Sequence, residues 1–249
     1  MIVRVHRLYS EQALEAGGSC KLSTRNEHYL LHVLRVEAGQ QLRLFDGSGA
    51  EYHALVRAVS RKAIDIEICD SVDAQLLLPE PSMATTLAIG VSKGERMDWV
   101  IQKATELGIS CIQPLQTQRV DVKLSADRWQ KKRTHWQDTA ISACEQCGRN
   151  VIPTIAEPVS LDNWLATDTS GRKFVLRAGF SPLAQLLNNC TAPDRASLLI
   201  GPEGGLSASE FDQALQSGFE AASLGPRILR TETAPVVALS LLQALWGDL

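Results

Sequence analysis

The chain has 249 residues, of which 45% are hydrophobic and 21% are charged, and its formal net charge is -3. This composition is typical of a globular protein with enough apolar mass for a core, and the length allows one large or two modest domains. The slightly acidic balance excludes a protein whose whole surface binds nucleic acid, so any surface of that kind must be a local basic patch.

Neither a cleavable leader nor a membrane span is predicted. Residues 1–10 lack the apolar core of a signal peptide, and the most apolar late segment, residues 236–246, is shorter than the roughly 18 to 20 residues that cross a bilayer. Of the cysteines, only Cys144 and Cys147 form a C-x-x-C pair, without the further ligands of a zinc site. We therefore expect a reduced cytoplasmic protein without a metal, in which these two thiols are small packing residues.

Short alternating segments dominate the first part of the chain. Strands are predicted in residues 2–9, 40–47, 51–59 and 63–70, and one short helix is predicted in residues 26–35. This pattern indicates a small β-barrel-like domain over residues 1–72. The two prolines of residues 73–82 indicate a linker.

Strands and helices alternate from residue 83 to residue 249. Strands are predicted in residues 85–91, 109–115, 173–178, 196–201 and 221–225, and the longest helices in residues 94–109, 126–148 and 235–246. In the first of these helices one face is apolar (Met97, Val100, Ile101, Ala104 and Leu107), and Gly108 stands where a C-cap belongs. This alternation predicts an α/β domain with a mostly parallel sheet that is covered on both faces.

A glycine-rich loop, GPEGGL at residues 201–206, follows the fourth of these strands. Ser207 and Glu210 then match a capping box, so the loop lies between the carboxyl end of a strand and the start of a helix. Open α/β sheets bind ligands there, and glycine lets a ligand approach the main chain. The loop matches neither G-x-G-x-x-G nor a phosphate-binding loop with its lysine. It is a small-ligand loop or an ordinary tight turn.

The next connection repeats this plan. Leu-Gly-Pro at residues 224–226 follows a short strand, and two arginines (Arg227 and Arg230), Glu232 and two threonines precede the last helix. Two ligand loops would then lie side by side. Alternatively, Thr231 or Thr233 caps the helix, and Arg230 with Glu232 is a surface ion pair of little energetic weight.

Taken together, five segments resemble one known family. They are HVLRVEAGQQLRLFDGSG (32–49), SKGERMDWVIQKATELG (92–108), EQCGRN (145–150), LLIGPEGGLSASE (198–210) and LGPRILRTETA (224–234). In this order and spacing they look like the ribosomal RNA small-subunit methyltransferase E family, SPOUT-class enzymes that methylate N3 of one uridine in 16S rRNA. The resemblance implies a PUA-like β-barrel that contacts RNA, followed by a SPOUT-type parallel sheet with a C-terminal trefoil knot. It also implies a homodimer that packs through the knot.

The resemblance implies S-adenosylmethionine as the cofactor, held in the knot by the two glycine loops. The implied cofactor-binding residues are Leu176, Ile200, Gly201, Pro202, Glu203, Gly204, Gly205, Leu224, Gly225, Pro226, Ile228, Leu229, Arg230, Thr231, Thr233 and Ala234. This sequence departs from the family at Arg177 and Ala178, where His-Pro is usual, and that departure affects the first wall of the pocket.

Methylation of uridine N3 requires in-line geometry and removal of the N3 proton. We expect Arg230 to stabilise the negative charge that spreads onto the uracil carbonyl oxygens, with Arg227 as the alternative. The proton acceptor stays open between Glu232 and no protein base. Glu203 is either a base or a staple that bonds loop amides.

The expected partner is 16S rRNA, free or in the assembled small subunit. Candidate RNA contacts are Arg7, Arg25, His32, Arg35, Lys93, Arg96, Arg119 and Lys123, although several could be ordinary solvated or structural side chains. Three other functions compete with this one. They are a related knotted methyltransferase with another target nucleoside, a ribosome-assembly factor without catalysis, and a nucleotide-dependent enzyme, against which the absent phosphate-binding motifs count.

Overall fold

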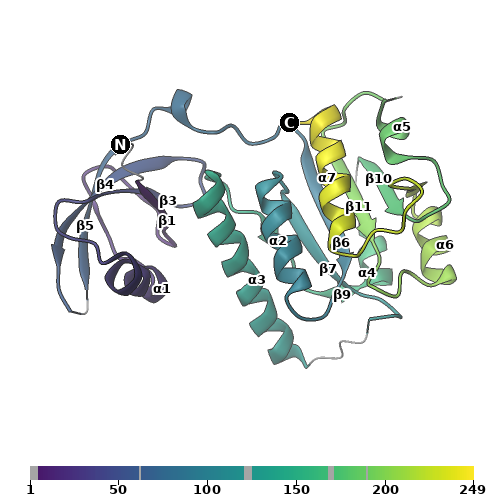
Figure 1. The fold of residues 1–249 in the computed structure, drawn as a ribbon, viewed down its shortest axis with the longest axis horizontal. Coiled ribbons are helices and arrows are strands. Elements are labelled where there is room, and N and C mark those ends of the chain that lie inside the picture. Colours follow the sequence, from purple (N-terminus) through teal and green to yellow (C-terminus); the bar gives the residue numbers. More distant parts are fainter. Residues whose placement is uncertain (1–4, 62, 121–124, 168–170, 189) are drawn as a thin grey trace. The chain divides into compact units, whose positions relative to one another are not determined.

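The computed structural model describes residues 5–61, 63–120, 125–167, 171–188 and 190–249, which divide into two compact units (Figure 1). The first unit comprises Met1–Glu80 and Cys144–Ile152, and the second comprises Pro81–Ala143 and Pro153–Leu249. Each unit contains its own cluster of buried apolar side chains. No helix of the described ranges is both long and apolar enough to cross a membrane.

A five-stranded sheet forms the first unit. Its strands, in the order of pairing, are β1 (His6–Tyr9), β3 (Gln41–Phe45), β4 (Glu51–Val59), β5 (Ile64–Ser71) and β2 (Ser19–Cys20). The β1–β3 pair is parallel, and the other pairs are antiparallel. The predicted barrel is thus a sheet whose hydrogen bonding, within the described residues, runs from β1 to β2 without joining these two edges. A short 3₁₀ turn, η2 (Ala74–Leu76), follows it.

The helix of this unit begins at Thr24, two residues before the predicted start, and its second part is a π-helical turn. Helix α1 (Thr24–His28) starts after Ser23, whose hydroxyl accepts a hydrogen bond from the Asn26 amide at 3.3 Å. It continues directly as a π-helical turn, η1 (Tyr29–Leu34), which ends at Arg35 in the left-handed conformation with φ 51°. Leu30 on this turn is fully buried in the core of the unit. Apolar periodicity predicts a helix here but does not distinguish an α-turn from a π-turn.

A parallel sheet forms the second unit, as predicted. Its strands are β12 (Glu220–Ala222), β10 (Arg172–Leu176), β11 (Arg195–Ile200), β6 (Ala84–Gly90), β7 (Cys111–Gln116) and β8 (Thr154–Ile155) in this order, with β9 (Val159–Ser160) also paired to β7. All pairs are parallel, so the carboxyl ends of the strands meet at one edge. The two-residue strands β8 and β9 are too short to leave a periodic pattern in the sequence.

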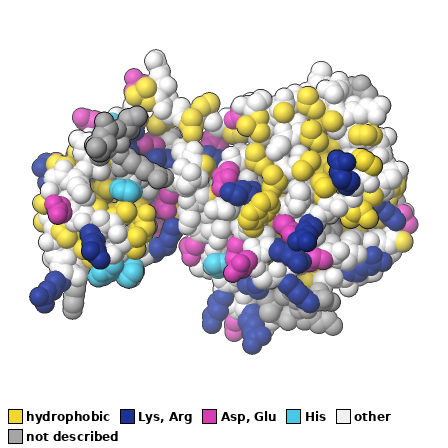
Figure 2. Space-filling view, in the orientation of Figure 1, with side chains coloured by type: hydrophobic (Ala, Val, Ile, Leu, Met, Phe, Trp, Pro, Cys, Tyr) yellow, Lys and Arg dark blue, Asp and Glu magenta, His cyan; other side chains and the backbone are white. Residues whose placement is uncertain are grey.

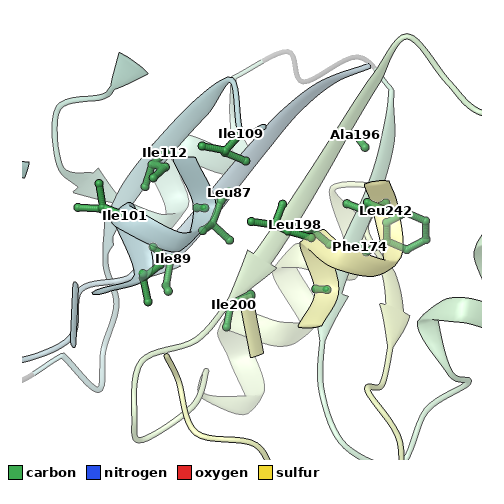
Figure 3. Close-up of a cluster of buried hydrophobic side chains, with 14 of the residues drawn as sticks. Leu87, Ile89, Ile101, Ile109, Ile112, Phe174, Ala196, Leu198, Ile200 and Leu242 are labelled. Carbon is green, nitrogen blue, oxygen red and sulfur yellow. The ribbon is translucent and has the colours of Figure 1, made fainter. Parts of the chain in front are cut away.

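Helices cover both faces of this sheet. One face packs against α2 (Arg96–Glu106), α3 (Ala126–Cys147), α5 (Leu183–Asn188) and α7 (Thr233–Trp246), and the other packs against α4 (Leu161–Leu165) and α6 (Ala208–Gln216). Alternate residues of β6 face opposite ways, since Leu87 and Ile89 join the first cluster and Ala88 joins the second (Figure 3). Four residues of the apolar face predicted for α2, Met97, Val100, Ile101 and Ala104, are buried, Leu107 is partly buried at the C-cap, and Gly108 follows with φ 77°.

Candidate functional site

A cavity of about 350 Å³ lies at the carboxyl ends of β10, β11 and β12, inside the second unit. Many of the cofactor-binding residues that the family resemblance implies line it: Leu176, Ile200, Gly201, Pro202, Glu203, Gly205, Leu224, Gly225, Ile228, Leu229, Thr231 and Ala234. The volume is in the range of pockets that hold drug-sized ligands, and its lining combines aliphatic side chains with main chain. The sequence therefore predicts most of the wall of this cavity.

Close main-chain packing accounts for the glycines of the first loop. The Gly205 amide donates to the Pro202 carbonyl at 2.7 Å, and Gly205 has φ 67°. A Cβ on Gly201 would lie 2.7 Å from the Leu206 amide nitrogen, which leaves no room for a side chain. At the end of β6, a Cβ on Gly90 would lie 2.5 Å from Pro202 Cδ. The loop is thus folded tightly on itself and against the neighbouring strand.

The predicted capping box is present, and its Glu210 also binds the loop after β7. The Ser207 hydroxyl accepts from the Glu210 amide at 3.2 Å, and the Glu210 carboxylate accepts from the Ser207 amide at 2.8 Å. The other carboxylate oxygen of Glu210 accepts from the Gln118 amide at 2.7 Å, while Arg119 donates to the Gly204 carbonyl at 2.8 Å. The loop after β7 is therefore tied to the glycine loop, which places Arg119 on the cavity wall.

Replacing Glu210 by alanine is expected to lower the free energy of unfolding by about 2 to 4 kcal/mol. Glu210 is 2% exposed, and each hydrogen bond to its carboxylate contributes about 1.5 to 3 kcal/mol. Guanidinium unfolding followed by tryptophan emission measures the loss. Glu210→Gln is the matched control, because it keeps one acceptor oxygen. A loss below about 0.5 kcal/mol for Glu210→Ala would contradict this role.

Glu203 acts as a staple between the glycine loop and the start of α2. Its Oε1 accepts from Arg96 Nη1 at 2.8 Å and from the Lys93 amide at 3.4 Å. Partial burial opposes ionisation, but hydrogen bonds from its own amide, from Arg96 and from the Lys93 amide hold the pKa of Glu203 below its usual value. A carboxylate with a lowered pKa is a weaker proton acceptor, so the geometry favours the staple over the base.

Around Arg230 the second loop opens toward solvent. The Arg230 side chain is 83% exposed and its Nη1 lies 3.9 Å from Glu232 Oε1, whose side chain is 19% exposed. The Arg230 carbonyl accepts from the Thr233 and Ala234 amides and so begins α7. Neither threonine caps the helix, since the N-cap residue is Glu232 and its side chain makes no capping hydrogen bond. The capping alternative for Thr231 and Thr233 is therefore wrong.

Four predicted cofactor residues do not reach the cavity wall: Gly204, Pro226, Arg230 and Thr233. Gly204 instead packs against Arg119, to whose Cβ an added Cβ would lie at 3.2 Å. Lining residues that the sequence did not reveal as such are Arg119, Leu206, Phe211 and Arg227, while Arg177 and Ala178 line the wall where the sequence placed them. The Arg177 guanidinium lies 4.4 Å from the centre of the Phe211 ring, so the pair that departs from His-Pro still contributes to the wall.

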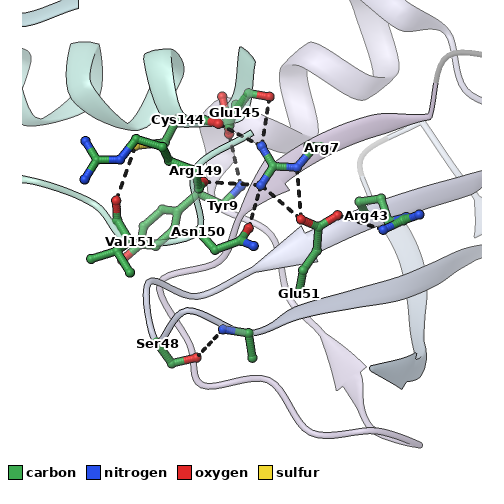
Figure 4. Close-up of polar contacts among 11 residues, drawn as sticks. Arg7, Tyr9, Arg43, Ser48, Glu51, Cys144, Glu145, Arg149, Asn150 and Val151 are labelled. Carbon is green, nitrogen blue, oxygen red and sulfur yellow. Dashed lines mark hydrogen bonds and ion pairs between the residues drawn. The ribbon is translucent and has the colours of Figure 1, made fainter. Parts of the chain in front are cut away.

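Arg7 is not an accessible RNA contact. Its guanidinium donates to Glu51, to the Cys144, Glu145 and Arg149 carbonyls and to Asn150 Oδ1, all within the first unit (Figure 4). Its side chain is only 15% exposed. The prediction that Arg7 contacts RNA is therefore corrected, because each of its three guanidinium nitrogens donates to an acceptor inside the protein.

The other predicted RNA contacts have different positions. Arg25 donates to Glu145 Oε2 at 3.0 Å and keeps 42% of its side chain exposed. His32 and Arg35 are exposed at and after η1, and Lys93 and Arg96 flank Glu203. Lys123 lies outside the described residues.

Cys144 belongs to the C-x-x-C pair that the sequence predicts to consist of packing residues. Burial raises the pKa of its thiol to about 12, which suits a packing residue.

Comparison with known proteins decides the family. A family model for the RNA methyltransferase domain matches residues 79–243, and one for the RNA methyltransferase PUA domain matches residues 24–69. The chain is 34% identical to the ribosomal RNA small subunit methyltransferase E of Buchnera aphidicola subsp. Acyrthosiphon pisum, over 98% of this chain and 95% of that one. This chain belongs to the ribosomal RNA small subunit methyltransferase E family. The enzyme of this name from Bacillus subtilis is 32% identical, over 93% and 92% of the two chains.

Two solved structures that are similar to this chain share its fold and hold the predicted cofactor. A putative methyltransferase from Legionella pneumophila in complex with S-adenosylmethionine matches with a TM-score of 0.91 and 40% identity, over 99% of this chain and 100% of that one. The family member from Neisseria gonorrhoeae bound to S-adenosylmethionine matches with a TM-score of 0.88 and 33% identity, over 98% and 99%. The prediction of an S-adenosylmethionine-dependent methyltransferase is confirmed. The 350 Å³ cavity with its main-chain wall fits such a ligand.

Proposed function

We propose that this chain transfers a methyl group from S-adenosylmethionine to N3 of one uridine in the 16S rRNA of the small ribosomal subunit. The observation that carries the proposal is the cavity that two Gly-Pro loops build at adjacent strand ends, with exposed Arg230 and half-buried Glu232 beside it. Family membership supports rRNA of the small subunit as the substrate. The choice of uridine N3 rests on the motif resemblance.

The residues of this chain would bind the cofactor, orient the uracil and favour removal of its N3 proton. When bound, the cofactor supplies a methyl group on a sulfonium. The loops around Gly201 and Gly225 hold it with main-chain groups, since both loops bring backbone to the cavity wall. Arg230 would stabilise the charge on the uracil oxygens. The proton acceptor stays open between Glu232 and no protein base.

The test of this function is a labelling experiment. The protein is incubated with radiolabelled S-adenosylmethionine and small subunits that lack native modification, and the labelled nucleoside of the 16S rRNA is identified by chromatography. N3-methyluridine is the expected product. Label in another nucleoside would replace the target and keep the enzyme class. Absence of label on both naked rRNA and assembled subunits, with cofactor binding intact, would favour a non-catalytic assembly factor.

Replacing Gly201 by alanine is expected to weaken S-adenosylmethionine binding at least tenfold. The new Cβ would lie 2.7 Å from the Leu206 amide nitrogen, so the loop must open. Isothermal titration calorimetry measures the dissociation constant. Gly204→Ala is the matched control, since Gly204 does not line the cavity and its added Cβ would meet Arg119 Cβ at 3.2 Å, a milder contact than that of Gly201. Equal dissociation constants for Gly201→Ala and the unmodified protein would refute a tight main-chain cradle.

We also propose that the chain is a homodimer. Helices α2 and α7 pack together and leave Trp99 and Leu245 each 40% exposed, which is apolar surface available to a second copy (Figure 1). Light scattering after size exclusion should give twice the mass of one chain. Leu245→Lys should shift the mass toward that of one chain.

A C-terminal trefoil knot is a further part of the proposal. Its support is that Ser223, directly after β12, is held by the loop after β10: its amide donates to the Ser181 carbonyl and its carbonyl accepts from the Leu183 amide. The chain then continues to α7, which contacts β11, the strand on the other side of β10 from β12. In single-molecule stretching, an unknotted chain of 249 residues reaches about 3.3 to 3.6 Å per residue, and a knotted chain should fall measurably short of this length.

A further inference from the structure

The helical turn of the first unit exposes an unusual set of side chains. Leu30 is fully buried, and Leu31 and Leu34 pack against the core, so the other side of the turn faces solvent. Surface helices place charged residues on that side. Here Tyr29 is 40% exposed and Val33 is 61% exposed.

Two histidines lie beside these residues. The His28 and His32 rings have centroids 4.6 Å apart at an angle of 50°, so they form a contacting pair that is exposed to solvent. Figure 2 shows histidine side chains gathered beside apolar surface over the α1 region. We call His28, Tyr29, His32 and Val33 the ring face.

Cations stand at both ends of the ring face. Arg25 lies one turn earlier and is held in place by Glu145 Oε2 at 3.0 Å. Arg35 ends the turn with φ 51°, the one positive φ of a non-glycine residue within the described ranges. Residues 21–35 carry three cations, Lys21, Arg25 and Arg35, against the single carboxylate of Glu27, in a chain whose net charge is -3. With Glu145, which binds Arg25, the patch has three cations against two carboxylates, so its net charge of +1 is still opposite in sign to that of the whole molecule.

We propose that the ring face stacks an unpaired base of RNA, while Arg25 and Arg35 contact the phosphates on either side of that base. Exposed aromatic and imidazole rings stack on bases of any sequence, and arginines supply the charge that the backbone requires. The inference rests on the proposed function, because that function makes RNA the substrate. The inference adds which part of the first unit binds that RNA.

The decisive variant is Tyr29→Ser with His32→Ser, which removes two rings at exposed positions. Two fluorescein-labelled probes of equal length are compared by anisotropy: an oligouridylate and an abasic oligoribonucleotide that has phosphates but no bases. We expect the variant to bind the oligouridylate about tenfold more weakly or worse, and the abasic probe as the unmodified protein does. His53→Ser, an exposed histidine on β4, is the matched control and should change neither affinity.

Three results would overturn the inference. They are an unchanged affinity for the oligouridylate, an equal loss on both probes, and normal RNA binding together with a reduced mass in light scattering, which would assign the ring face to a protein contact. Unchanged hydrogen-exchange protection of residues 5–71 shows that the first unit of the variant is folded, which cofactor binding in the second unit would not report. The labelling experiment separates the two proposals: unmodified protein that methylates no rRNA refutes the function, whereas active protein with a normal ring-face variant refutes only this inference.

Discussion

Arg230→Ala is expected to lower the turnover number by about 100- to 1,000-fold and to leave S-adenosylmethionine binding and stability unchanged. That range is typical for removal of one group that stabilises developing charge in a transition state. The structure explains why stability should not suffer. The side chain is 83% exposed, and its ion pair with Glu232 at 3.9 Å contributes little. The carbonyl of Arg230 begins α7, and alanine retains it.

Three further variants make this test specific. Arg230→Lys keeps the charge without the planar fork, so it should recover part of the activity. Arg227→Ala tests the alternative arginine, which lies on the cavity wall. Glu232→Gln separates the two proton-acceptor hypotheses, because an unchanged rate would mean that no protein base is needed. A normal turnover number for Arg230→Ala would move the charge-stabilising role to another residue.

Much of the second unit could be predicted from local patterns. Strands β6 and β11 each contain an apolar segment that ends at or just before a glycine, and α6 begins with a capping box that two residues, Ser207 and Glu210, encode. Open α/β sheets bind ligands at the carboxyl ends of their strands, so both Gly-Pro loops are expected at one edge of the sheet. The cavity lies at that edge. The five predicted strands of this unit are all present, and four of them have the five to seven residues in which a pattern can be detected, whereas β12 has three.

The remaining features depend on contacts between distant residues. Phe211 belongs to the apolar face of an amphipathic helix, which indicates core, and its place in the cavity wall follows only from how α6 packs. Helices α4 and α5 have five and six residues, too few for a clear period. Arg7 lies on an edge strand, which indicates exposure, yet the carbonyl of Cys144 that it binds is 137 residues away.

Arg7→Ala is expected to lower the stability of the first unit by about 3 to 5 kcal/mol, as for other buried ion pairs that lose one partner. Within the described residues, the carboxylate of Glu51, whose side chain is 6% exposed, would keep Arg43 as its one cationic partner, at 3.0 Å. The carbonyls of Cys144 and Glu145 in the last turn of α3 would lose a cationic cap. Loss of hydrogen-exchange protection in residues 5–71 and 144–152 measures the effect.

The aromatic composition allows the two units to be followed separately. All five tryptophans lie in the second unit, so their emission reports on the unfolding of that unit. In Arg7→Ala the midpoint of the emission change in denaturant should shift little, while the exchange protection of the first unit falls. Arg43→Ala is the matched control, because Arg43 makes one bond to the same carboxylate and its side chain is 28% exposed, and about 1 kcal/mol is expected. The EQCGRN segment then has a physical meaning, since its backbone and Asn150 form much of the socket for Arg7. Unchanged protection in Arg7→Ala together with weakened RNA binding would return Arg7 to the RNA surface.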